Sequence, residues 1–142
     1  YIPLELWLKT FEAVQREIGP NALFKIGQHG VKNPNFPESV KDLEGALRQI
    51  DLAFHLSHRK GGVSMLDKVT GRMMEGIGHY LVHRTAGQKK ILVHCDTPYP
   101  CLGELGLVSG IAALFGPRSV VTHGDEQCRM KGGERCTYVV SW

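Results

Sequence analysis

The sequence predicts an α+β domain in which an antiparallel sheet carries helices packed on one side. Three observations lead to this class. Apolar residues recur at helical spacing in the N-terminal half, two alternating segments flank a glycine-containing turn, and a glycine-rich apolar helix precedes two short strands. A chain of 142 residues lies within the usual size of one domain, so we expect 1–142 to form a single domain.

Two amphipathic helices are predicted in the N-terminal half. In the first, over 4–18, apolar residues return every three or four positions until Gly19 and Pro20 end the helix. A loop rich in asparagine and proline at 33–37 separates it from the second helix, predicted over 39–58. We expect both apolar faces to pack in a core, although the first could also pack on a second copy of the chain.

His55 and His58 are three residues apart on the second helix and therefore share one face, a spacing that could bind a metal. No third ligand is indicated nearby. Ordinary surface or helix-end histidines are the favoured interpretation.

A β-hairpin is predicted at 79–95. Its strands cover 79–84 and 89–95, and the turn contains a glycine. Both faces of the second strand are apolar, so we expect Cys95 to be buried and to stand outside any metal site. The preceding stretch 65–77 mixes methionines with glycines and predicts neither a helix nor a strand.

An apolar helix is predicted over 101–115. Cys101 occupies its first turn, where free N–H groups and the helix dipole favour a thiolate. Gly103, Gly106 and Gly110 give it a flank that permits close approach by another backbone or a ligand. The final strand places one set of side chains on a single face: Cys136, Tyr138, Val140 and Trp142.

Metal-ligand residue types gather near the C-terminus. Cys128 and Cys136 flank seven residues that include two glycines, Asp125 lies three residues before Cys128, and Cys101 lies upstream. Zinc prefers thiolate and imidazole and accepts carboxylate in a tetrahedral array, so the pattern predicts a structural zinc site. The alternative is that these are ordinary buried cysteines.

The C-terminal third resembles the vinyl-4-reductase-type small-molecule-binding domain, in particular the zinc-containing form in phenol- and toluene-sensing bacterial transcription regulators. The similar motifs are Tyr-Pro-Cys ending at Cys101, Gly-Pro-Arg at 116–118, the valine strand ending at His123, the pair Gly132-Gly133, and the last seven residues from Cys136 to Trp142.

This resemblance implies a zinc site made by Cys101, Asp125, Cys128 and Cys136. The family carboxylate is usually glutamate, and this chain has one extra residue between the helix and the second cysteine. His123 is therefore an alternative fourth ligand, since imidazole binds zinc as well as carboxylate does.

The resemblance also implies a function: a sensory or regulatory domain, not an enzyme. We expect a small, largely apolar ligand, aromatic or hydrocarbon-like, in a cavity between sheet and helices, with zinc at its rim or floor. The domain is expected to form a homodimer and to be part of a longer protein with an output domain. Occupancy would act by favouring one state over another.

Three alternatives stay open. A zinc hydrolase would use Glu104, Asp125 or Glu126 as general base, but three thiolates make the metal a poor activator of water. A thiol redox switch would pair Cys95 with Cys101, or Cys128 with Cys136. A tetrapyrrole-handling domain is suggested by the family and by seven histidines, although no CxxCH motif is present.

Charge and hydropathy set limits on partners and location. The net charge of +3 is dispersed and no basic run occurs, so direct contact with nucleic acid is not expected. No apolar stretch is long enough to cross a bilayer and no leader peptide is evident, which predicts a cytoplasmic protein without membrane contact.

Overall fold

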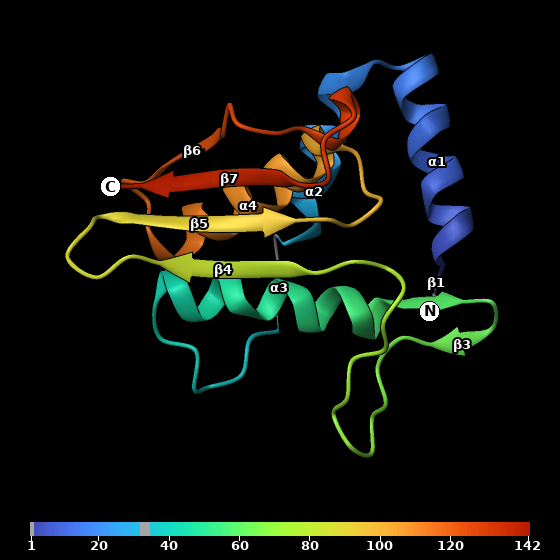
Figure 1. Ribbon diagram of the computed structural model, residues 1–142, viewed down its shortest axis with the longest axis horizontal. Helices are drawn as coiled ribbons and strands as arrows, with labels where there is room; N and C mark the ends of the chain where they lie inside the picture. Colours follow the sequence, from blue (N-terminus) through green and yellow to red (C-terminus); the bar gives the residue numbers. More distant parts are fainter. Residues whose placement is uncertain (1, 32–34) are drawn as a thin grey trace.

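The computed structural model describes residues 2–31 and 35–142. A four-stranded antiparallel sheet is covered by helices on one face (Figure 1). Its strands are β4 (Tyr80–Arg84), β5 (Lys90–Cys95), β6 (Val120–His123) and β7 (Cys136–Ser141), in the spatial order β4-β5-β7-β6. This arrangement confirms the predicted α+β class, and the antiparallel pairing of β4 with β5 confirms the predicted hairpin.

The covered face of this sheet forms the core. Side chains alternate along its central strands, and the buried set is Ile91, Val93 and Cys95 from β5 with Cys136, Tyr138 and Val140 from β7. The side chains between them are half-buried or exposed. Cys95 is fully buried, as predicted.

Four α-helices accompany the sheet: α1 (Leu4–Glu17), α2 (Pro20–Gly30), α3 (Leu43–Ser57) and α4 (Cys101–Phe115). The structure confirms the predictions for α1, α3 and α4, although α3 begins later than predicted because Asp42 caps it by accepting a 2.7 Å hydrogen bond from the Gly45 N–H. Of the predicted loop at 33–37, residues 35–37 lie in neither helix nor strand, and 33 and 34 are outside the described residues.

Helix α2 was not predicted. Gly19 breaks α1 with a φ of 116°, and Pro20 then occupies the first turn of α2, where its fixed φ and missing N–H are tolerated. Helix α2 packs closely on α4. A Cβ on Gly27 would collide with the carbonyl of Gly103, so the glycine flank predicted on α4 does permit a close backbone approach.

A second, smaller sheet joins the N-terminus to the end of α3. It consists of β1 (Ile2–Pro3), β2 (His58–Lys60) and β3 (Val63–Ser64), with β1 parallel to β2. Residue 58, predicted to be helical, is therefore the first residue of a strand. The stretch 65–77 is largely irregular, with one isolated bridge between Leu66 and Met73.

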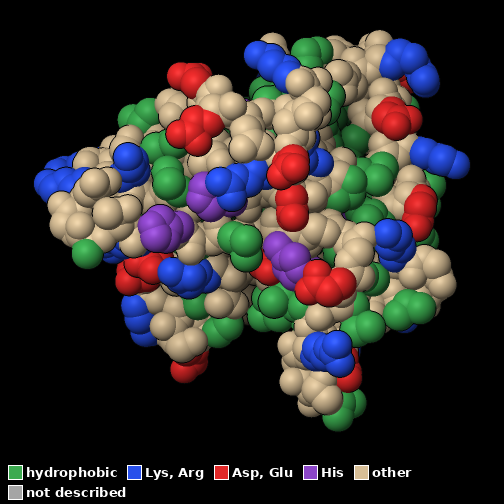
Figure 2. Space-filling view, in the orientation of Figure 1, with side chains coloured by type: hydrophobic (Ala, Val, Ile, Leu, Met, Phe, Trp, Pro, Cys, Tyr) green, Lys and Arg blue, Asp and Glu red, His purple; other side chains and the backbone are tan. Residues whose placement is uncertain are grey.

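The surface mixes charges of both signs. In Figure 2 basic, acidic and histidine side chains lie interspersed over the visible face. Among the described residues, no helix combines the length and the apolar character needed to cross a lipid bilayer.

Candidate functional site

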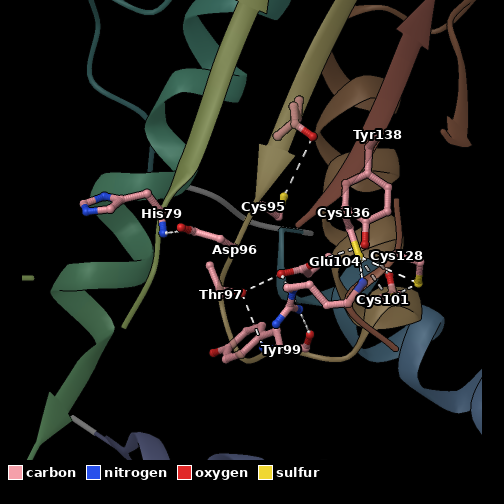
Figure 3. Close-up of polar contacts among 12 residues, drawn as sticks. His79, Cys95, Asp96, Thr97, Tyr99, Cys101, Glu104, Cys128, Cys136 and Tyr138 are labelled. Atoms are coloured by element: carbon pink, nitrogen blue, oxygen red, sulfur yellow. Dashed lines mark hydrogen bonds and ion pairs between the residues drawn. The ribbon is translucent and has the colours of Figure 1, made fainter. Parts of the chain in front are cut away.

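Three cysteines and one histidine converge at one end of the main sheet. Cys101, His123, Cys128 and Cys136, here called the cysteine–histidine cluster, each offer a ligand atom within 4.8 Å of the others. The Cys101 Sγ atom lies 3.4 Å from that of Cys128 and 3.2 Å from that of Cys136, and the latter two sulfurs are 4.0 Å apart (Figure 3). Three elements and a loop thus meet at the four side chains.

The loop between β6 and β7 brings the last two cysteines together. Cys128 precedes a short 3-10 helix, η1 (Arg129–Lys131), and Gly132 follows with a φ of 85°, the left-handed region that favours glycine. The Gly133 N–H then donates to the Cys128 carbonyl at 2.9 Å, which closes the turn. This turn returns the chain so that the Cys128 and Cys136 side chains lie near one another.

Asp125 does not join the cluster. Its side chain is exposed, whereas His123 supplies the fourth group. The Nδ1 atom of His123 lies 2.6 Å from the Gly124 carbonyl and donates to it, and Nε2 is buried without a hydrogen-bond partner. A histidine whose Nδ1–H is fixed on a carbonyl keeps the Nε2 lone pair for a ligand.

The thiols are not equally acidic. Burial, followed by hydrogen bonds with the thiols of Cys136 and Cys128, raises the pKa of Cys101 to about 12. For Cys128, burial acts to raise the pKa, but hydrogen bonds from the Cys101 thiol and from backbone N–H groups bring it below its usual value.

A cavity of about 530 Å³ lies beside the cluster, among the helices. Its walls come from β1, α1, α2, α3, α4 and the start of β2, and none of the lining residues belongs to the four-stranded sheet. The sequence predicts a cavity between the sheet and the helices. The observed cavity lies among the helices instead, and part of its wall is α2, a helix that the sequence did not predict. The apolar lining includes Trp7, Phe11, Ile26, Phe36, Phe54, Leu107 and Ile111.

His58 and Tyr99 form the main polar pair in the cavity wall. The Nδ1 atom of His58 lies 3.2 Å from the Ile2 carbonyl, and its Nε2 is hydrogen-bonded to the Tyr99 hydroxyl. His58 is only 2% exposed, which corrects its interpretation as a surface histidine. Burial lowers the pKa of His58, so the ring is neutral and accepts from the tyrosine. Sequence spacing gave no signal for this pair, since the two residues are 41 positions apart.

A second polar cluster links α3 to β4. Asp51, His55 and His79, here called the aspartate–histidine cluster, also lie within 4.8 Å of one another. The Asp51 carboxylate accepts from the Tyr80 N–H at 3.0 Å and from His79 Nδ1 at 2.9 Å. His55 is fully buried, so it is not a surface histidine either, but His55 in the last turn of α3 and His58 at its C-cap are helix-end histidines, as the prediction allowed.

Of the three predicted general bases, Glu104 is buried and the other two, Asp125 and Glu126, are exposed. Burial raises the pKa of Glu104 to about 7. Its carboxylate is already held by Thr97 Oγ1 at 2.5 Å and by the Tyr138 hydroxyl at 2.9 Å (Figure 3). None of the three carboxylates is a member of the cysteine–histidine cluster.

Comparison with solved structures identifies the fold. The chain matches an H-NOX protein from S. oneidensis in the Fe(II)NO ligation state with a TM-score of 0.65 and 13% identity, over 99% of this chain and 76% of that one. It matches the H-NOX domain of Shewanella oneidensis in the Fe(II)CO state with a TM-score of 0.62 and 12% identity, over 95% and 72%. A T. tengcongensis H-NOX mutant gives 0.59 and 16%, over 92% and 69%. This chain therefore has the H-NOX fold.

Sequence comparison adds no further relationship. No protein-family model matches the chain. No curated protein matches it either.

These findings correct two predictions. The resemblance to the vinyl-4-reductase-type zinc sensor domain is wrong, since the structural neighbours are H-NOX proteins. The prediction of zinc as the cofactor is wrong with it, because the structural neighbours are described with heme or with Fe(II). The layout of helices on one face of an antiparallel sheet is common to the predicted class and the observed fold, which explains why the class was right and the family was not.

The residues of this cavity do not fit a heme. Heme iron needs an axial ligand such as His, Cys, Met or Tyr. Both ring nitrogens of His58, the one imidazole among the described lining residues, are already hydrogen-bonded. Burial raises the pKa of Tyr99, which disfavours a phenolate ligand. No Lys or Arg occurs among the described lining residues to pair with propionate groups.

Proposed function

We propose that this chain is a small-molecule-binding regulatory domain whose cavity takes a neutral, mostly apolar ligand. The observation that carries the proposal is the cavity itself, about 530 Å³ and lined by aromatic and aliphatic side chains. Its volume lies within the range of known ligand sites. The described lining residues include no Asp, Glu, Lys or Arg, so a charged ligand would lose its hydration without gaining a partner.

The structural neighbours support a sensory role. Two of them are described in Fe(II)NO and Fe(II)CO ligation states, so in those proteins this fold holds a small ligand. We transfer to this chain the role of ligand binding and leave out the heme, because the lining residues do not fit it. The Tyr99 hydroxyl, bonded to His58 in the cavity wall, would then accept a hydrogen bond from one polar group on an otherwise apolar guest.

We further propose that the cysteine–histidine cluster binds a thiophilic metal ion in a structural role. Three thiols and a buried, unpartnered imidazole nitrogen make a complete tetrahedral donor set. Because four protein groups fill the coordination shell, no position is left for a reactive water, which argues against the hydrolase alternative. The metal would tie α4, β6 and β7 together at the site where their ends meet.

A dye-binding experiment tests the ligand proposal. Nile red, a neutral solvatochromic dye, should bind with a blue-shifted emission. Ala53→Trp places a bulky ring in the cavity wall and should weaken binding at least tenfold. Ala86→Trp, in the exposed turn between β4 and β5, is the matched control and should bind as the wild type does. Equal affinity in all three proteins would contradict the proposal.

Native mass spectrometry tests the remaining parts in one spectrum. We expect one metal ion per chain, and any retained ligand would add its mass. The predicted homodimer and output domain stay predictions that the same spectrum, recorded on the full-length protein, can check. Added hemin should give no Soret shift beyond that seen with an unrelated protein; a sharp, stoichiometric band would show that the cavity rearranges to take heme.

One observation keeps the thiol redox switch as a second candidate. The Sγ atom of Cys101 lies only 3.2 Å from that of Cys136 and 3.4 Å from that of Cys128, so oxidation by a peroxide could join Cys101 to either one. The previously expected pairing of Cys95 with Cys101 lacks this support, because Cys95 is not a member of the cluster. Thiols that are protected from alkylation until a chelator is added would favour the metal site over the switch.

A further inference from the structure

We propose that the cavity and the cysteine–histidine cluster are thermodynamically coupled, so that metal in the cluster tightens binding in the cavity. This inference rests on the proposed function, since both sites must bind. Coupling between two sites is reciprocal: the factor by which metal changes ligand affinity equals the factor by which ligand changes metal affinity. The structure contains one short route that joins the two.

The segment 97–101 belongs to both sites. The ring of Tyr99 lines the cavity and its hydroxyl is bonded to His58. Two residues later, Cys101 supplies a sulfur to the cluster. Phe11 and Phe54 pack edge-on against the Tyr99 ring at centroid distances of 5.1 and 5.2 Å, so the ring cannot shift without disturbing the cavity wall.

Arg129 connects this segment to the loop that carries the other two cysteines. It follows Cys128 directly, and its backbone N–H donates to the Cys136 sulfur at 3.4 Å. Its guanidinium reaches back across the loop and donates to the Tyr99 carbonyl. One residue therefore contacts the cluster with its backbone and the cavity segment with its side chain.

Glu104 holds the guanidinium in place from the protein interior. The fully buried carboxylate lies 3.5 Å from Arg129 Nη2. The Tyr138 hydroxyl, bonded to this carboxylate, is also 3.0 Å from the Cys101 carbonyl (Figure 3). Because these buried partners are fixed by several hydrogen bonds, a displacement of Tyr99 is passed to Arg129 and the loop instead of being absorbed nearby.

Metal should strengthen ligand binding, and not weaken it, because it orders the cavity wall in advance. With metal bound, the loop that carries Cys128 and Cys136 has one conformation, and Arg129 holds the Tyr99 carbonyl so that the ring is fixed against His58. Without metal, the loop has fewer constraints and a ligand must order the wall as it binds. A cavity already ordered by metal gives up less entropy, so its affinity is higher. We expect an effect of about tenfold, within the usual range for coupled sites.

The experiment compares the Kd of Nile red with and without Co²⁺, in the whole chain and in two variants. The wild type should bind the dye about tenfold more tightly when cobalt is present. Arg129→Met removes the link and should reduce the ratio below twofold. Arg135→Met is the matched control: it removes the same charge from the same loop at an exposed position, and should keep the wild-type ratio.

Other results would contradict separate parts of this proposal. Equal dye affinity with and without cobalt in the wild type, when both bind, overturns the coupling and leaves the proposed function intact. An undiminished ratio in Arg129→Met overturns the route through Arg129. Failure of the dye to bind in any state overturns both the coupling and the proposed function. If Arg129→Met does not fold by circular dichroism, Tyr99→Phe tests the same route, since it frees the ring from His58 and should also lower the ratio.

Discussion

The cysteine–histidine cluster has four members and the aspartate–histidine cluster three, and the two differ in how their charges are balanced. Both gather potential metal ligands within 4.8 Å. In the aspartate–histidine cluster the carboxylate of Asp51 already has a backbone N–H and the His79 ring as donors. In the cysteine–histidine cluster three sulfurs face one another and the Nε2 of His123 has no partner.

This difference shows why proximity of ligand residues is a weak criterion for a metal site. His55 Nε2 in the aspartate–histidine cluster is also buried without a hydrogen-bond partner, so an unpartnered nitrogen alone does not separate the two clusters. The difference lies in the other members: the Asp51 carboxylate and the His79 ring are bonded to each other, whereas His123 lies beside three thiols, which bind metal as thiolates. We therefore expect one cluster to bind metal and the other to stabilise the fold without it.

Metal binding should give the largest effect. Co²⁺ at about a thousand times its Kd should stabilise the fold by about 4 kcal/mol. For a domain of this size that corresponds to a rise in Tm of roughly 10 °C. Thiolate-to-cobalt absorbance and thermal unfolding measure it.

Two variants separate the clusters in that experiment. Cys136→Ser should lose both the cobalt band and the rise in Tm, whereas His79→Ala should keep both. A cobalt band that depends on His79 would reverse the comparison.

The second-largest effect concerns the aspartate–histidine cluster and needs no metal. Asp51→Ala should lower the free energy of unfolding by about 3 kcal/mol, because it leaves the buried partners of the carboxylate uncompensated. Urea unfolding in the presence of a chelator measures this. Asp42→Ala, on the same helix, removes only the N-cap and should cost about 1 kcal/mol. A loss in Asp51→Ala no larger than in this control would show that the cluster does not stabilise the fold.

Much of the fold could be predicted from sequence because its signals are local. The spacing of apolar residues in α1 and the alternation in β5 lie within one element and gave those elements correctly. Helix α2 was missed because its signal is not local. It contains a proline and two glycines, and its stability depends on lying against the glycines of α4, which are more than 70 positions away.

For the candidate site, the residue types predicted the three cysteines, but sequence positions did not predict which residue would be the fourth member. The sequence singled out Cys101, Cys128 and Cys136, and the structure brings their sulfurs together. The choice between Asp125 and His123 depended on where β6 ends relative to the loop, which no spacing rule supplies. The buried role of His58 on β2 depends on Tyr99, 41 positions away, and His55 on α3 stacks on His79, which lies outside that helix, so spacing rules within one helix could not find either role.

Replacing His123, the proposed fourth metal ligand, tests the same comparison through a smaller effect. His123→Ala should weaken Co²⁺ binding at least tenfold, about 1.4 kcal/mol, because the tetrahedral shell loses its only nitrogen donor. Asp125→Ala should leave the affinity unchanged, since that side chain is exposed and outside the cluster. Competition between cobalt and a chromophoric chelator measures both. The opposite ranking would restore the carboxylate as the ligand.

The smallest effect is a pH dependence of the aspartate–histidine cluster. Burial acts to lower the pKa of His79, but its hydrogen bonds to the carboxylates of Asp51 and Glu75 raise it above the ordinary value of 6.5. The folded protein thus binds the proton more tightly than the unfolded chain does. The resulting stability is fully present below pH 6.5 and is lost as pH rises through the raised folded value.

We expect this contribution to be about 0.5 kcal/mol, because the His79 ring is partly exposed and solvent screens its ion pairs. Urea unfolding gives the free energy of unfolding of wild type and His79→Gln at pH 5.5 and at pH 8. The difference between the two proteins is then compared between the two pH values, so that groups present in both proteins cancel. His83→Gln changes an exposed histidine on β4, the strand that follows His79; it is the control and should track the wild type. A wild-type advantage that grows toward pH 8 would mean that the carboxylates do not hold a protonated ring, and the aspartate–histidine cluster would then lack the internal charge balance that sets it apart from the cysteine–histidine cluster.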